Sequence, residues 1–168
     1  MKKYIILLLI TPLLGQGYSW PTGTGKNLSS NFGEFRTTGY HLGIDVKTKG
    51  TEGHPIYAID DGYVFRVITN YSGFGKALYY KLADGKIAVY AHLSTFSSKL
   101  EHRLKEEQEK SQSYLTNFYP KENEFSFSKN DVIAYSGNTG FSFGPHLHFE
   151  LRDEKGNILN PLTNGINQ

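Results

Sequence analysis

Two histidines and a glutamate alternate in one short segment, as His146, His148 and Glu150. The residues between them are apolar, a pattern typical of a β-strand with one buried face, so the three polar side chains project to the other side. Two neighbouring imidazoles repel each other when protonated, which destabilises a fold unless a metal or a reaction uses them. The segment is therefore a candidate functional strand, and the alternative is an exposed polar face on an edge strand.

Two further segments carry histidines suited to the same chemistry. His41 and Asp45 stand four residues apart beside glycines, and in an extended chain such positions share a face. His92 follows an apolar run. Considered alone, His92 is interpreted as a buried, hydrogen-bonded histidine, and His41 and Asp45 are interpreted as surface residues. Together, two imidazoles and one carboxylate would fill three positions of a tetrahedral zinc site and leave the fourth for water. Two histidines would remain for proton transfer.

Short β-type runs must position these side chains. Glycine, asparagine and aspartate mark turns between them, and the runs cover residues 55–59, 62–69, 77–81, 86–91, 132–136 and 146–152. The turn at Asp84-Gly85 joins two of the runs in a hairpin over residues 78–90. We expect one mainly β domain, an antiparallel sheet of the barrel or sandwich kind, with a short helical insertion between strands.

That insertion covers residues 98–113, which are rich in Glu, Lys and Gln. Leu100 and Leu104 stand four residues apart, and Glu101 and Lys105 form an acid–base pair at helical spacing. The pattern predicts an exposed helix. It is either a solvated spacer or a lid or substrate-selecting wall beside the site.

The composition narrows the chemistry further. The 168 residues include no cysteine, which excludes disulfide frameworks, thiolate metal sites and cysteine nucleophiles, so any metal is held by His, Asp or Glu. Residues 1–17 carry Lys2 and Lys3 and no acid, and the rest of the chain has 16 basic and 16 acidic residues. This balance, without a basic stripe, argues against nucleic-acid binding.

Residues 1–17 have the layout of a secretory signal peptide. Two lysines precede the apolar run 4–14, and Gly15 and Gly17 place small residues at the −3 and −1 positions of a cut. As a helix the run would span about 16 Å, against roughly 30 Å of membrane hydrocarbon, which favours cleavage over anchoring. We expect an exported bacterial protein, periplasmic or extracellular, with no stable membrane anchor after cleavage.

Several motifs follow one another in a fixed order between residues 30 and 161. They are Ser30-Asn31-Phe32-Gly33 with Arg36, His41 with Asp45, residues 53–58, residues 61–64, residues 90–94 and residues 137–150. In this order they resemble the M23 family of zinc metallopeptidases (lysostaphin-type, LytM-like), which cut peptide bonds in bacterial peptidoglycan. The resemblance covers nearly all of the chain after residue 17.

The resemblance implies a lysostaphin-type fold and one zinc ion held by His41, Asp45 and His148. It further implies that His92 and His146 act on the water and on the developing oxyanion. A zinc ion lowers the pKa of bound water from about 15.7 towards 7 and polarises a carbonyl, so such a site needs no serine or cysteine nucleophile. The expected protein is a zinc metalloendopeptidase.

The expected organisation is a signal peptide over residues 1–17, an N-terminal arm over 18–29, a peptidase domain over 30–163 with an insertion at 94–130, and a tail over 164–168. The arm is an ordered strand, a groove-blocking segment or a loose tail, and the stretch after Pro161 looks disordered or like the stub of something longer. Expected partners are peptidoglycan peptides as substrate and a regulatory protein as a further candidate. The protein is expected to be a monomer that binds no nucleic acid.

Some residues stand apart from the family pattern. His54 and His102 match no site position and read as ordinary surface or packing residues, and Lys81-Leu82 stands where many relatives have a histidine. Glu150 either orients a metal ligand or forms a structural salt bridge. The insertion is expected to reshape one wall of the substrate groove.

Two other functions compete with a peptidase. A catalytically silent relative would bind the cell wall or activate another hydrolase. Such proteins usually lose ligand positions, whereas in this chain all five site residues are present. A 2-His-1-carboxylate iron oxygenase or cupin-like enzyme has a different ligand spacing from His41 with Asp45.

Overall fold

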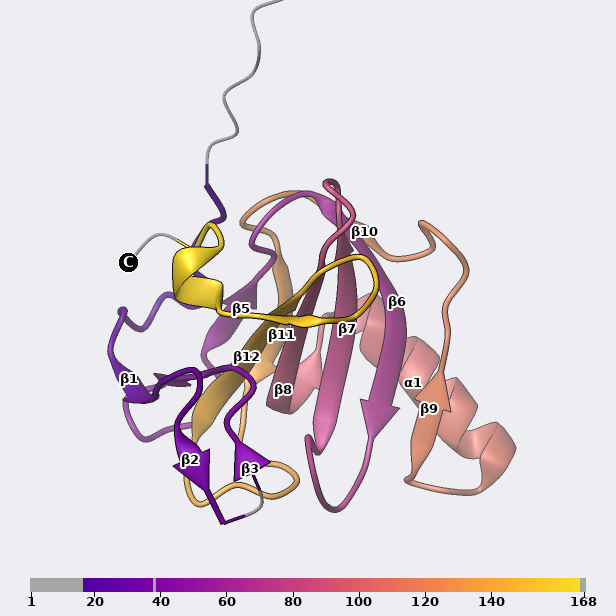
Figure 1. Ribbon diagram of the computed structural model, residues 1–168. Coiled ribbons are helices and arrows are strands. Elements are labelled where there is room, and N and C mark those ends of the chain that lie inside the picture. The colour runs from indigo at the N-terminus through magenta and orange to yellow at the C-terminus, as the bar shows by residue number, and fades with distance from the viewer. Residues whose placement is uncertain (1–16, 38, 167–168) are drawn as a thin grey trace, which may run out of the picture.

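An eleven-stranded antiparallel sheet forms most of the protein (Figure 1). The computed structural model describes residues 17–37 and 39–166, so the predicted signal peptide lies outside the described residues except for Gly17. The main path of the sheet is β1-β4-β12-β8-β7-β6-β10, with β5, β9, β11 and β13 paired at its sides. A separate two-stranded sheet joins β2 and β3.

The elements have the following bounds. The strands are β1 (Leu28–Ser30), β2 (Phe35–Arg36), β3 (Gly39–Tyr40), β4 (Ile44–Lys47), β5 (Pro55–Tyr57), β6 (Gly62–Thr69), β7 (Lys76–Leu82), β8 (Ile87–Phe96), β9 (Thr116–Phe118), β10 (Ser126–Phe127), β11 (Val132–Ser136), β12 (His146–Arg152) and β13 (Ile158–Leu159). The helices are α1 (Ser98–Ser111) and the 3-10 turn η1 (Pro161–Thr163).

The mainly β, antiparallel architecture predicted from the sequence is confirmed. The runs predicted at 62–69, 132–136 and 146–152 coincide with β6, β11 and β12. The hairpin predicted over residues 78–90 is the pairing of β7 with β8. The apolar run that ends in His92 belongs to β8, which continues four residues further to Phe96 because β11 pairs with its end.

One face of the sheet is packed in the core and the other carries the polar residues of β12. Leu147, Phe149 and Leu151 are fully buried in the core, as alternation along a strand requires. His146, His148, Glu150 and Arg152 project from the opposite face. We call this side of β12, continued across β8, β7 and β6, the site face.

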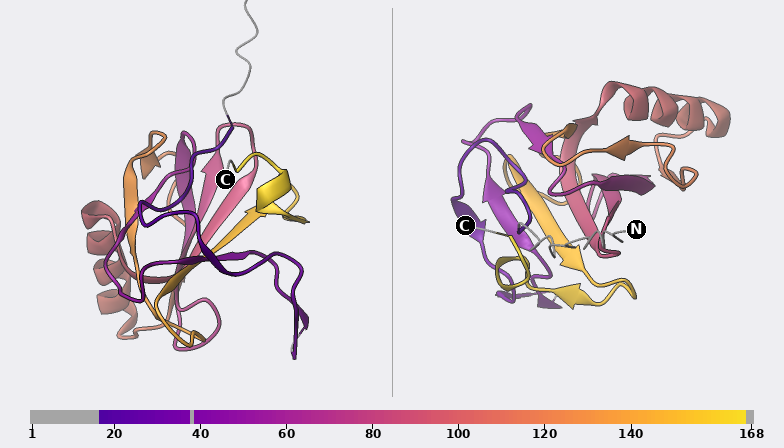
Figure 2. Two further views of the ribbon diagram at one scale, coloured as in Figure 1. Left: turned by 90° about the vertical axis from the view of Figure 1, so that its left-hand side faces the viewer. Right: turned by 90° about the horizontal axis from the view of Figure 1, so that it is seen from above.

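The insertion between β8 and β11 is part of the folded body. Leu100 and Leu104 are fully buried in the hydrophobic core, so the prediction of an exposed helix is wrong for this side of α1. After the helix the chain returns as β9 and pairs with β6, which widens the sheet. Figures 1 and 2 show α1 and β9 at the β6 side, away from β4 and β12. The helix is therefore packed against the body of the protein on the side of Leu100 and Leu104.

The two ends of the described chain lie side by side. Tyr18 pairs with Ile166 in an isolated parallel bridge, and both side chains are buried. The prediction of disorder after Pro161 is therefore wrong up to Ile166, because the last apolar residue contributes to the core. Tyr18 also donates a 2.5 Å hydrogen bond to Asp84 in the turn between β7 and β8. This part of the N-terminal arm is ordered against the body of the protein.

The described part of the chain includes no helix that is both long and apolar enough to span a membrane.

Candidate metal centre

His41 lies at the start of the site, in the link between β3 and β4. Its ring is buried, and its Nδ1 lies 2.8 Å from the main-chain oxygen of Asn31. Because a carbonyl only accepts hydrogen bonds, Nδ1 carries the hydrogen and Nε2 keeps its lone pair. The Nε2 atom points to Asp45, whose Oδ1 is 3.1 Å away.

Asp45 lies on β4 with its two carboxylate oxygens in different roles. Oδ2 accepts a 2.7 Å hydrogen bond from Arg36, and Oδ1 faces His41 and His148. Burial raises the pKa of Asp45, but the neighbouring imidazoles of His148 and His41 and the hydrogen bond from Arg36 outweigh burial and hold the pKa well below the usual range. The carboxylate is therefore ionised and leaves Oδ1 free for a cation.

His148 lies directly opposite Asp45, since β12 pairs with β4 at this position. Its Nε2 donates a hydrogen bond to Oε1 of Glu150 at 3.1 Å, so Nδ1 is the nitrogen that faces Asp45. Burial lowers the pKa of His148, but Asp45 and Glu150 outweigh burial and raise it overall. Glu150 is only 1% exposed and is paired in turn with Arg152.

Three ligand atoms converge from these residues. Nε2 of His41 is 3.0 Å from Nδ1 of His148, and Oδ1 of Asp45 lies 3.1 and 2.9 Å from these two nitrogens. A tetrahedral zinc ion with bonds of about 2.0–2.1 Å needs its ligand atoms roughly 3.3 Å apart. The described residues contain one such group of three, and it is the set predicted from the sequence. Two imidazoles and one carboxylate fit a zinc ion and leave a fourth position open.

Two more imidazoles stand beside this group. His146 donates from Nδ1 to the Gly144 carbonyl at 2.8 Å, and its Nε2 is 3.6 Å from Oδ1 of Asp45. The rings of His92 and His146 are 4.8 Å apart. The structure thus brings together all five predicted site residues, which are four histidines and one aspartate. The assignment of ligand and catalytic roles among them stays a prediction.

His92 reaches the site through an irregularity in β8. Its backbone has a left-handed φ of 59°, and the register between β7 and β8 shifts across this point. Regular alternation would place His92 on the buried side with Tyr90, and the bulge turns it to the site face instead. Its Nδ1 donates to the Thr139 carbonyl at 2.8 Å, and burial lowers the pKa of His92 to about 4.

Arg36 and Thr139 are contributors that the sequence did not single out as site residues. Arg36 appeared only as part of a motif, and its contact with Asp45 depends on how the hairpin of β2 and β3 folds over β4. Thr139 contributes its backbone carbonyl, and every residue type has one, so the sequence does not indicate this contact. His54 and His102 lie outside the group: His54 bonds Thr51, and His102 is on the exposed side of α1.

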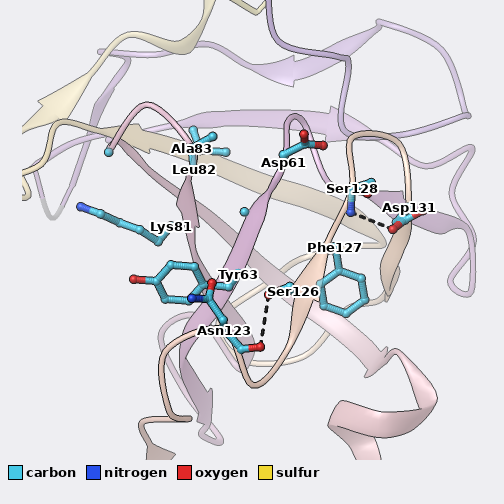
Figure 3. A pocket seen from close by; sticks show the side chains of 12 residues that line it. Asp61, Tyr63, Lys81, Leu82, Ala83, Asn123, Ser126, Phe127, Ser128 and Asp131 are labelled. Carbon is cyan, nitrogen blue, oxygen red and sulfur yellow. Dashed lines mark hydrogen bonds between the residues drawn. The ribbon is translucent and has the colours of Figure 1, made fainter.

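A separate hollow of about 620 Å³ lies at the Gly62 end of β6 (Figure 3). Its lining includes Asp61, Tyr63, Lys81 and Asp131. It contains none of the five predicted site residues, and the hydrogen bonds drawn within it join only its own lining residues.

Comparison with known proteins agrees with this geometry. The model of "Peptidase family M23" matches residues 39–118, which include His41, Asp45 and His92. The chain belongs to peptidase family M23. This family membership implies zinc, and the group formed by His41, Asp45 and His148 could hold such an ion.

Relatives in the M23 family differ in what they do. The chain is 32% identical over 123 residues to the DD-carboxypeptidase/endopeptidase Mpg of Neisseria meningitidis serogroup B, covering 73% of this chain and 22% of that protein. It is 31% identical over 145 residues to the murein hydrolase activator NlpD of Salmonella dublin, covering 86% and 30%. The chain therefore spans less than a third of the length of these curated relatives.

The fold has a solved counterpart in the catalytic domain of the antimicrobial peptidase lysostaphin from Staphylococcus simulans. The two share 22% identity with a TM-score of 0.58, over 82% of this chain and 90% of that domain. At this identity the likeness shows the fold alone, and it confirms the lysostaphin-type architecture.

Proposed function

We propose that the protein is an exported zinc metalloendopeptidase that hydrolyses peptide bonds in the cross-bridges or stem peptides of bacterial peptidoglycan. One observation carries the proposal. His41, Asp45 and His148 each have two side-chain atoms that could bind a metal. In each residue one of these atoms makes a hydrogen bond to a neighbouring group, and the other faces the centre. Such partners fix the orientation of metal ligands and strengthen their hold on the ion.

The chain's own residues fit the steps of hydrolysis. A bound zinc ion would supply an activated water and polarise the scissile carbonyl. His92 and His146 each have Nδ1 held by a backbone carbonyl, which leaves Nε2 of each ring as an acceptor. Such a nitrogen can take a proton from the water, donate a hydrogen bond to the developing oxyanion while it is protonated, and then deliver the proton to the leaving amine. No covalent intermediate with the enzyme is required.

An activator without catalysis is the second candidate, because NlpD is among the relatives. It predicts that some site residue is missing or is turned away from the centre. In this chain all five residues are present and lie together, which favours the enzyme.

The test is digestion of isolated sacculi by the purified protein in the presence of zinc. The wild type is expected to release fragments with new amino termini, which mass analysis identifies. Asp45→Ala and His146→Ala are expected to release none, the first because a ligand is lost and the second because a proton-transfer group is lost. Absence of new amino termini with the zinc-loaded wild type would reject the peptidase and favour the activator.

A further inference from the structure

A β-bulge on β6 places two neighbouring residues on the site face. Val64 pairs with Tyr80 and Arg66 pairs with Tyr79, so Phe65 is one residue too many for its partner strand. Val64 and Val67 on either side are fully buried in the core. Phe65 and Arg66 therefore both leave the strand away from the core, and both contact the ring of Tyr79. Bulges of this kind redirect side chains beside functional sites.

Arg66 is held in one orientation by three contacts. The carbon at the centre of its guanidinium, Cζ, is 4.9 Å from the ring centre of Tyr79 and 5.6 Å from that of Tyr119. Its Nε donates a 2.9 Å hydrogen bond to Oδ1 of Asn117. Asn117 and Tyr119 come from β9 and the residue after it, so the insertion supplies two of the three contacts. The terminal nitrogens of Arg66 are left without a hydrogen-bond acceptor among the described residues.

The charge of Arg66 is not balanced locally. Within the described ranges, no carboxylate forms an ion pair with Arg66 or with Lys81, which lies two residues beyond Tyr79 on the same face of β7. Figure 3 shows Lys81 extended away from the carboxylates of Asp61 and Asp131. Arg152, whose Cζ is 5.5 Å from the same Tyr79 ring, is instead neutralised by Glu150. The site face therefore carries an excess of positive charge around Tyr79.

This charge lies three strands from β12, which carries His148. The strand registers pair Glu150 with Val89, Val89 with Tyr79, and Tyr79 with Arg66, so one row of residues crosses β12, β8, β7 and β6. Three strand spacings of about 4.8 Å, together with the offset of two residues of about 3.3 Å each between Glu150 and His148, put Arg66 about 16 Å from His148. An extended peptide advances about 3.3 Å per residue, so this distance corresponds to roughly five residues.

We propose that Arg66 binds a carboxylate of the peptide substrate, roughly five residues from the bond that is cut. A guanidinium stacked on aromatic rings keeps its edge free, and its planar fork matches the two oxygens of a carboxylate. The site thus selects an acidic peptide, with Lys81 adding positive charge nearby. The inference rests on the proposed peptidase function, because that function supplies the peptide.

The test compares two forms of one substrate. Peptide-bearing fragments are released from sacculi with a muramidase and used either as they are or after carbodiimide amidation of their carboxyl groups. Hydrolysis gives KM and kcat for both forms, and titration into the His146→Ala protein gives binding without cutting. For the wild type we expect the native fragments to have a KM about tenfold lower than the amidated ones. In Arg66→Gln this ratio should fall to about one, with kcat unchanged.

A matched control distinguishes a binding role from a structural one. Arg103 on α1 also stacks on an aromatic ring, with its Cζ 5.6 Å from the Phe118 ring centre, but it is paired with Glu107. Arg103→Gln should therefore keep the tenfold preference. If Arg66 only fastens β9 to β6, Arg66→Gln would weaken both forms of the substrate equally, and the inference would be wrong.

The outcomes also separate this inference from the proposed function. Hydrolysis by the wild type with no preference for native fragments overturns the carboxylate site and leaves the peptidase standing. Preferential binding of native fragments that depends on Arg66, with no hydrolysis, supports the carboxylate site and rejects the peptidase. Equal competition by inorganic phosphate and by acetate at Arg66 would show a general anion site and overturn the proposed selectivity for peptides.

Discussion

The Nε2 atom of His148 donates to Oε1 of the buried Glu150 at 3.1 Å, and this contact decides which nitrogen of His148 faces Asp45. We predict that Glu150→Gln lowers zinc affinity about tenfold, because the neutral amide holds the imidazole less strongly. Competition with a chromophoric zinc chelator measures the change. Glu154→Gln, at an exposed position two residues beyond the strand, is the control and should leave affinity unaltered. Equal affinities in all three proteins would contradict a positioning role for Glu150.

His92 and His146 are expected to serve catalysis without holding the metal. We predict that His92→Ala lowers kcat by about 10²–10⁴-fold, the usual contribution of a general acid or base, while zinc still binds at one ion per chain. Hydrolysis rates and metal analysis on the same sample provide the two readouts. His54→Ala is the matched control, since this histidine bonds Thr51 outside the site and its loss should change neither. Loss of zinc from His92→Ala would instead make His92 a ligand.

Part of this site was accessible from the sequence and part was not. The alternation along β12 predicted correctly that His146, His148 and Glu150 share a face, because a regular strand fixes side-chain direction. The same rule fails at His92, where the left-handed backbone turns the ring to the other side. That conformation depends on β7 and on Thr139, which are distant from His92 in the sequence. The pattern of residues around His92 therefore does not predict it.

The fold shows the same division. Long apolar runs such as β6 and β12 were predicted with their full bounds, since their periodicity is sustained over several residues. The bulge at Phe65 was not foreseen, because one extra residue alters register only against a partner strand. Ile166 was assigned to a disordered end, whereas it is buried beside Tyr18 through a contact that spans almost the whole described chain.

The loop that carries Thr139 requires glycine at Gly140. Its φ is 74°, and a Cβ built there would lie 2.3 Å from the backbone nitrogen of Gly75. We predict that Gly140→Ala destabilises the protein by about 2–4 kcal/mol, from the strained φ and the overlap together. Gly50 has nearly the same φ, 73°, but no atom within 4 Å, so Gly50→Ala should cost only about 1 kcal/mol. Urea unfolding of both variants measures the difference, and equal losses would show that the close approach is unimportant.

The start of α1 is stabilised by Glu101 in a pH-dependent way. Burial raises the pKa of Glu101, but the hydrogen bond from the Phe96 N–H and the ion pair with Lys76 outweigh burial, so the pKa of Glu101 in the folded protein lies below its ordinary value of 4.5. A carboxylate with a depressed folded pKa stabilises the fold above its unfolded pKa, and this contribution is lost as the pH falls through the folded value.

We therefore predict that Glu101→Gln lowers stability by about 1–2 kcal/mol at pH 7 and that the deficit shrinks once the pH falls below 4.5. Chemical unfolding at several pH values gives this profile. Glu109→Gln, exposed on the same helix, is expected to match the wild type throughout. A deficit that stays constant with pH would mean that the charge of Glu101 contributes nothing.

We propose that hydrolysis depends on one zinc ion held by the group formed by His41, Asp45 and His148. The most direct measurement adds zinc stepwise to metal-free protein and counts the new amino groups released from sacculi at each step. We expect release to rise with added zinc and to level off at one equivalent, and we expect no rise with Asp45→Ala. Full release before any zinc is added, or none at any amount of zinc, would contradict it.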